Sequence, residues 1–183
     1  MKTTFLILLF ILILFFGTAD AANPVRLKSF SASGGILLPQ DNWDNGFSIE
    51  LQSDFGEIIK YVFLFPHIGY WQAGMNKEGM DLSYTDIFLG TKFIGYFNSK
   101  PRGFYAGLGV QYHIIGMDEI SGGFDTIDDT ITKQNFTRVG YSVIAGYLFK
   151  LKKVSFSIEP GYTIIPGADN MITINLGIGY LLP

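Results

Sequence analysis

The chain has 183 residues, no cysteine and a formal net charge of −3 at pH 7. Charged residues make up 16% of it, against roughly 25% in ordinary soluble domains, while aromatic residues also reach 16% and glycines number 22. These values exclude a disulfide scaffold, and they give no basic surface of the kind that binds nucleic acid.

The first 21 residues have the pattern of a cleaved secretory signal. Lys2 supplies a positive charge, residues 5–16 are an unbroken run of Phe, Leu and Ile, and Ala19 and Ala21 form an A-x-A cleavage site. The run is shorter than the roughly 20 residues that a membrane helix requires. We therefore predict a signal peptide at residues 1–21 and a single mature domain at residues 22–183.

Beyond the signal, bulky apolar residues alternate with small or polar ones in segments about ten residues long. Residues 171–182 show it best, with Ile, Leu and Tyr alternating with Thr, Asn and Gly. A period of two marks a strand, and Gly, Ser and Thr opposite bulky residues fit a narrow polar interior surrounded by lipid. Eight strands are predicted, at residues 26–38, 46–55, 58–71, 81–97, 103–115, 137–150, 153–165 and 171–182.

Two irregularities are expected within these strands. Residues 82–97 alternate in two halves whose registers disagree, which predicts a β-bulge near Asp86. Pro160 falls on the apolar face of its strand and removes a backbone donor, so a bulge or local break is expected there.

When the connections between the predicted strands are numbered in chain order, the even-numbered ones differ in length from most of the odd-numbered ones. The second, fourth and sixth connections, residues 56–57, 98–102 and 151–152, are short, whereas 39–45, 72–80 and 116–136 are longer; the seventh connection, 166–170, is short too. In a barrel with periplasmic termini, the even connections are short periplasmic turns and the odd ones face outside. The pattern favours an all-β protein, a single antiparallel up-and-down transmembrane β-barrel of about eight strands.

In its signal, mature length, eight alternating strands and connection parity, the chain resembles the OmpA/OmpX-type small outer-membrane barrels, over essentially all of the mature part. The resemblance implies a monomer in the outer membrane of a Gram-negative bacterium, with both termini in the periplasm. It also implies contact with outer-membrane lipid and with the barrel-assembly machinery. Such barrels usually end on an aromatic residue, most often Phe, whereas this chain ends on Pro183, three residues after Tyr180.

Charged and amide side chains on the predicted inner faces point to a polar network inside the barrel. Buried charges must pair or be hydrated, and an eight-stranded barrel is just wide enough for its own side chains to fill. We therefore expect a plugged interior in which Arg138 pairs with a carboxylate, with a narrow gated conduit as the alternative. The predicted network comprises Glu50, Gln52, Asp54, Gln111, His113, Arg138, Lys150 and Glu159.

The longest predicted loop, residues 116–136, is acidic, and an unidentified extracellular ligand could contact it. Carboxylate oxygens suit calcium, but the spacing matches no EF-hand loop, so no metal or cofactor site is predicted. Trp43 and Trp71 lie at the outer ends of predicted strands and are expected at a membrane interface. The acidic residues are Asp118, Glu119, Asp125, Asp128 and Asp129.

No catalytic residues are predicted. Barrel-type lipid A deacylases pair a His with a Ser two residues later, whereas Ile115 follows His113 and Gly69 follows His67. We predict a non-enzymatic integral outer-membrane protein with a structural role or a surface-interaction role through its loops. Two alternatives stay open, a barrel enzyme acting on envelope lipids and an exported soluble barrel that binds an apolar ligand.

Overall fold

The computed structural model describes residues 26–40, 43–77, 80–98, 101–121 and 130–183. The predicted signal peptide and three of the acidic loop residues, Asp125, Asp128 and Asp129, lie outside these ranges. Within them, no helix is long and apolar enough to cross a membrane.

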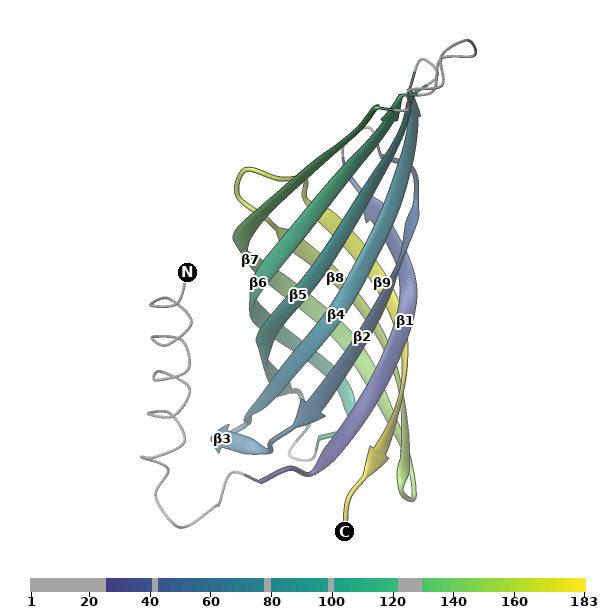
Figure 1. The fold of residues 1–183 in the computed structure, drawn as a ribbon. Helices are drawn as coiled ribbons and strands as arrows, with labels where there is room; N and C mark the ends of the chain where they lie inside the picture. Colours follow the sequence, from purple (N-terminus) through teal and green to yellow (C-terminus); the bar gives the residue numbers. More distant parts are fainter. Residues whose placement is uncertain (1–25, 41–42, 78–79, 99–100, 122–129) are drawn as a thin grey trace.

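The described strands form one antiparallel sheet that closes on itself (Figure 1). Strands adjacent in sequence pair with each other, β1 also pairs with β9, and pairing of β2 with β4 completes the ring. The short β3 pairs only with the start of β4, so eight strands make up the wall and the predicted all-β barrel is confirmed. The strands are β1 Ser29–Pro39, β2 Gly46–Asp54, β3 Glu57–Ile59, β4 Val62–Lys77, β5 Met80–Tyr96, β6 Gly103–Ser121, β7 Thr130–Leu151, β8 Val154–Ile164 and β9 Met171–Leu181.

The strand ends define two ends of the barrel. The terminal end carries Pro183, the start of β1 and the β2–β4, β5–β6 and β7–β8 connections, and the loop end carries the other four connections. The connections therefore alternate between the two ends as expected, but their lengths do not all follow the prediction: the third connection, 78–79, is shorter than the fourth, 97–102.

The two faces of the wall differ in chemistry, as the alternation predicts. In β9, Thr173 and Asn175 are buried in the lumen, whereas Leu176 and Ile178 are 64% and 56% exposed on the outside. Glycine on the inner face makes room for larger neighbours: a Cβ on Gly140 would collide with the His113 ring. The narrow lumen thus depends on glycine where rings and charges cross it.

Four strands continue past the rest of the wall at the loop end (Figure 1). β4 and β5 remain paired to Lys77 and Met80, and β6 and β7 to Ser121 and Thr130. β2 pairs with β4 only as far as Gln72, and β8 pairs with β7 only from Tyr141. We call residues 74–77, 80–83, 117–121 and 130–139 the projecting sheet.

The projecting sheet corrects two predicted loops, because most of residues 72–80 and 116–136 is paired strand. Met117, for example, faces Gln134 across the β6–β7 ladder. Backbone pairing continues there, but the sequence lacks the apolar alternation by which the other strands were recognised.

The bulge predicted near Asp86 is absent from the described β5 ladders. Its pairings with β4 and β6 run without a register shift, and Tyr84, Asp86 and Phe88 all face the lumen. The apparent change of register arose because large apolar residues as well as polar ones face inward. At Pro160, the β7–β8 pairing stops between Gly161 and Ile158 and resumes in the same register, so a local break is present without a bulge.

Apolar side chains fill the lumen at two levels. A loop-end cluster is formed by Leu37, Trp71, Ala73, Tyr84, Phe88, Ile115, Ile165 and Met171. A terminal-end cluster is formed by Phe65, Ile94, Tyr96, Tyr105 and Ile144.

Candidate functional site

Lys92 is the centre of a buried charge cluster that crosses the lumen. Its Nζ lies 2.5 Å from Glu50 Oε1 on β2 and 2.7 Å from Glu159 Oε1 on β8. All three side chains are almost completely buried, and the Tyr105 hydroxyl donates to Glu159 Oε2 at 2.8 Å. The cluster therefore ties three separate strands of the wall together through charge-assisted hydrogen bonds.

A second buried pair lies nearer the loop end. His113 Nδ1 is 2.7 Å from Asp86 Oδ2, and neither side chain is exposed to solvent. Trp71 and Phe88 pack on the His113 ring, with centroid distances of 5.4 and 5.6 Å. The imidazole is thus fixed by one carboxylate and two rings.

Amide, hydroxyl and imidazole groups extend this polar layer around the lumen. Gln111 Nε2 lies 3.0 Å from His67 Nε2, and the Ser48 hydroxyl donates to Asn175 Oδ1 at 2.5 Å. These contacts join β6 to β4 and β2 to β9. Together with the Lys92 cluster and the Asp86–His113 pair, they form a hydrogen-bonded layer that links strands which are not neighbours in the wall.

The structure brings several sequence-predicted residues together in this layer. Glu50 and Glu159 meet at Lys92, with the Gln52 amide oxygen 3.4 Å from Lys92 Nζ. Gln111 and His113 are also buried in the lumen. Asp54 and Lys150 lie apart from Lys92, beside a cavity of about 30 Å³ at the terminal end, which is room for about one water molecule.

Arg138 is not part of the network and is exposed on the projecting sheet. Its Nη1 donates to the Thr137 carbonyl at 2.9 Å, and its guanidinium carbon lies 5.0 Å from the centre of the Phe136 ring. The cation that pairs with the buried carboxylates is Lys92 and not Arg138. Arg138 has the inward parity of β7, but the pairing of β7 with β8 ends at Tyr141, so Arg138 has no β8 neighbour and its guanidinium lies over the Phe136 ring beside Gly167.

Neither tryptophan lies on the outer surface. Trp71 is 3% exposed and packs on Phe88 at a centroid distance of 4.7 Å. Trp43 is half-buried against Tyr84, and its Nε1 donates to Asp169 Oδ2 at 2.5 Å. The expected interfacial position is wrong for both, because their rings help to fill the loop end of the lumen.

The network predicted from the sequence did not include three buried lumen residues, Lys92, Asp86 and His67. A signal for the first two was available, because Asp86 and Lys92 share one parity on β5, and a charge in mid-strand of such a barrel must face the lumen. The assumed bulge concealed that shared parity. His67 lies in a segment that is apolar on both faces, which gave no indication of its direction.

The Asp86–His113 pair has the form of a general base held by a carboxylate. Such a pair activates a nucleophile only if the nucleophile lies within hydrogen-bonding distance of the free imidazole nitrogen. Ser142 on β7 is buried on the same inner face, but neither its Oγ nor His113 Nε2 has a hydrogen-bond partner. Among the described residues, no group of three His, Asp or Glu side chains could hold a metal ion.

The acidic residues are placed only in part. Asp118 is half-buried on β6, where it pairs in register with Lys133, and Glu119 follows it in the same strand. They lie in paired strands of the projecting sheet and not in a loop as the sequence predicted.

Solved structures with the same architecture are known. Neisserial surface protein A matches over 84% of this chain and 95% of its own, with 15% identity and a TM-score of 0.53. The fold is that of the small outer-membrane β-barrels. Ail of Yersinia pestis, solved with the heparin analogue sucrose octasulfate, matches over 85% of this chain and 99% of its own, with 11% identity and a TM-score of 0.55.

A third structure with the outer-membrane-barrel fold is a major outer membrane protein from Thermus thermophilus. It matches over 84% of this chain and 98% of its own, with 10% identity and a TM-score of 0.59. No protein-family model matches the sequence, and the search of curated proteins gave no match. At these identities the likeness extends to the fold alone.

Proposed function

We propose that the chain is a non-enzymatic, monomeric integral protein of a bacterial outer membrane, with both termini in the periplasm. The observation that carries the proposal is the distribution of side chains: ion pairs lie inside the closed barrel, and Leu, Ile, Val and aromatic side chains cover its outside. A soluble protein rarely exposes a continuous apolar surface of this extent, whereas a membrane barrel requires one.

Outward-facing rings near both ends of the strands support the same proposal. On β7, Phe149 lies near the terminal end, and Tyr141 lies where the pairing of β7 with β8 ends toward the loop end; both rings are exposed on the outside. The two rings are eight positions apart, which is a rise of about 26 Å along the strand, or about 19 Å along the membrane normal at a 45° tilt, so both fit within or at the edges of an apolar belt of about 25 Å. Aromatic rings of this kind favour the lipid–water interface.

The lumen argues against the two alternatives. A soluble barrel for an apolar ligand needs an apolar cavity, whereas here the interior holds rings at two levels and charges between them. A lipid hydrolase needs an activated nucleophile, and no hydroxyl bonds to His113 Nε2.

Heat-modifiable migration tests the proposal. A closed barrel resists SDS until it is boiled, so the unboiled protein in outer-membrane fractions should run at a different apparent mass from the boiled one. A periplasmic, soluble protein without this shift would refute membrane insertion. Hydrolysis of purified lipid A by the folded protein would refute the non-enzymatic role.

We also propose that residues 1–21 are removed during export and that the mature chain is delivered to the barrel-assembly machinery. The intact mass of the protein from outer membranes should match residues 22–183. The variant Ala21→Leu should retain the precursor mass, because a bulky residue at the cleavage position blocks the peptidase.

For the surface role, we propose that the projecting sheet contacts an extracellular partner. Along β7, residues 130–140 have no β8 partner, so this edge offers backbone groups to another strand. Five acidic residues and Lys133 give residues 116–136 a formal charge of −4. A basic partner is therefore favoured, and a polyanion such as the heparin analogue bound by Ail is not.

Binding of polylysine and of heparin to the refolded protein tests this charge argument. We expect salt-sensitive binding of polylysine, weakened when the five acids are replaced by their amides, and no binding of heparin. Heparin binding, or polylysine binding that the amide variant retains, would contradict the proposal.

A further inference from the structure

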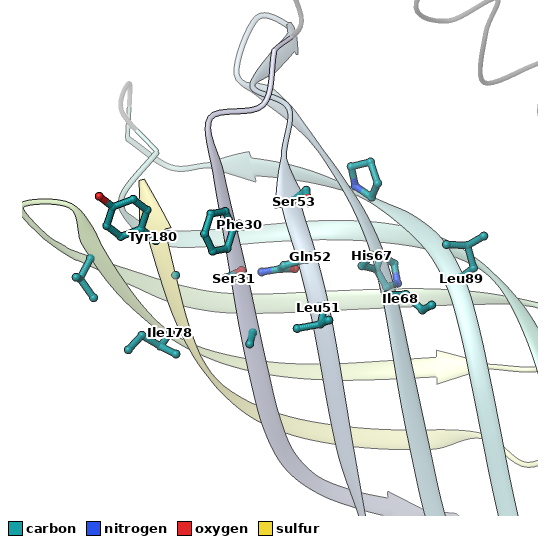
Figure 2. A pocket seen from close by; sticks show the side chains of 14 residues that line it. Phe30, Ser31, Leu51, Gln52, Ser53, His67, Ile68, Leu89, Ile178 and Tyr180 are labelled. Atoms are coloured by element: carbon teal, nitrogen blue, oxygen red, sulfur yellow. The ribbon is translucent and has the colours of Figure 1, made fainter. Parts of the chain in front are cut away.

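A groove of about 730 Å³ interrupts the outer wall across β9, β1, β2, β4 and β5 (Figure 2). One register row explains its shape: Ile178, Ala32 and Leu51 are neighbours on successive strands, and the row continues through Ile68 to Leu89. Ala32 is the only small side chain in that row. Because Ala32 has only a methyl group as its side chain, a hollow remains between the larger branched side chains of the row.

The groove extends toward the terminal end. Ser53 pairs with Phe30, so a second small side chain lies one row beyond Ala32 on the neighbouring strand. Phe30 and Tyr180 form the adjoining wall, with ring centroids 6.0 Å apart, and Figure 2 shows these rings next to each other. Its lining is apolar, and it opens to the outside, where hydrocarbon would lie in a membrane-embedded barrel.

Two exposed lysines lie at the terminal end of this groove. The backbone of Leu182 donates to the Lys28 carbonyl, and that of Leu181 donates to the Lys153 carbonyl, both at 2.8 Å. These bonds hold Lys28 and Lys153 on either side of the end of β9, just beyond Tyr180. The Lys28 side chain lies beside Gly56, and Asp54, two residues before that glycine, faces the lumen and is 6% exposed.

We propose that the groove holds an acyl chain of an anionic phospholipid of the periplasmic leaflet, with its phosphate at Lys28 and Lys153. The proposal rests on membrane insertion in the orientation proposed above. An elongated apolar hollow accommodates hydrocarbon, and lysines at its periplasmic rim attract an anionic headgroup. The combination favours a charged lipid over a zwitterionic one.

Photolabelling of the full mature chain in phosphatidylcholine vesicles tests the site. Phosphatidylglycerol with a diazirine in its acyl chain serves as the probe, and the same diazirine in phosphatidylcholine serves as the comparison. Labelled residues mapped by mass spectrometry should concentrate at 30–32, 51–53 and 178–180. The outward residues of β6 and β7 on the other side of the barrel should be labelled less.

Matched variants separate shape from charge. Ala32→Phe fills the hollow and should reduce groove labelling to the level of β7, whereas Ala145→Phe, an exposed alanine on β7, should not. Lys28→Gln should lower the preference for phosphatidylglycerol by about five-fold, the factor that corresponds to about 1 kcal/mol per cation near a membrane surface. Arg102→Gln, at another terminal-end turn, should leave the preference unchanged.

The outcomes distinguish this proposal from membrane insertion itself. Even labelling around the wall, unaffected by Ala32→Phe, would leave insertion intact and overturn the groove. Groove labelling without preference for the anionic lipid would overturn the role of the lysines. Labelling of no outward position would refute membrane insertion.

Discussion

At the residue scale, the charges inside this barrel act through mutual pairing. Lys92 neutralises one of two carboxylates, and Tyr105 supplies a hydrogen bond to Glu159. Burying an ion pair contributes little net stability, but removing one partner leaves an uncompensated charge in a low dielectric. The cluster therefore makes the packing of opposite walls interdependent.

We expect Lys92→Met to destabilise the folded barrel by about 3–5 kcal/mol, because Glu50 and Glu159 would remain buried without their cation. Urea unfolding in lipid vesicles, followed by mobility on unboiled gels, measures the change. The matched control is Arg138→Ala, which removes an exposed cation and should shift stability by no more than about 0.5 kcal/mol. Equal losses for the two variants would contradict the assignment.

Glycine on the inner face provides a second residue-scale prediction. A Cβ on Gly140 would overlap His113, whose ring is held by Asp86 and cannot move aside easily. Gly140→Ala should therefore destabilise the barrel by about 1–3 kcal/mol, as overpacking does. On the outer face, a Cβ on Gly34 meets only the Ser48 carbonyl at 3.6 Å, so Gly34→Ala should be tolerated in the same unfolding assay.

At the element scale, the projecting sheet is distinct from the barrel wall. Its strands keep their ladder hydrogen bonds above the level at which β2 and β8 stop pairing with it. It is therefore expected to stand outside the lipid and to contribute little to closure of the barrel.

Replacing residues 118–133 with Asn-Gly tests this separation. Met117 and Gln134 are register partners, so a two-residue turn can join them without moving either strand. We expect the shortened protein to keep its heat-modifiable migration. Loss of the migration shift would show that the projecting sheet is required for the barrel to close.

At the scale of the whole molecule, the barrel carries apolar side chains on its outside and charged side chains in its interior, the reverse of a soluble protein. Leu108 and Leu151 have similar exposed fractions, 62% and 57%. The free-energy cost of a charged side chain would differ between the two positions only if lipid surrounds the barrel. Leu108 lies inside the wall part of β6, five positions from the terminal-end start of the strand at Gly103, whereas Leu151 is the last residue of β7 at the terminal end.

Leu108→Arg should destabilise the barrel in vesicles by about 2–4 kcal/mol and Leu151→Arg by no more than about 1 kcal/mol, because the penalty for a charge falls from the midplane to the interface. Unfolding titrations of both variants in one lipid measure the difference. Equal and small effects would indicate that water surrounds the outer wall.

The sequence alone determined the strand number, the antiparallel order and the parity of the connections. The strand backbone directs successive side chains to opposite faces. The resulting alternation can be recognised in the sequence wherever one face meets lipid and the other a polar lumen. The same argument placed Glu50, Gln111 and Glu159 on inward faces, since each lies in a strand with unbroken alternation.

Only the tertiary structure decided which inward groups meet. Lys92 bonds to residues 42 and 67 positions away in the chain, and such partners depend on strand tilt and stagger, which no local pattern records. It also decided where β8 stops pairing with β7, which left Arg138 exposed, and it placed Trp43 and Trp71 at the loop end of the lumen. Parity gives the direction of a side chain, whereas its surroundings depend on how far each neighbouring strand extends.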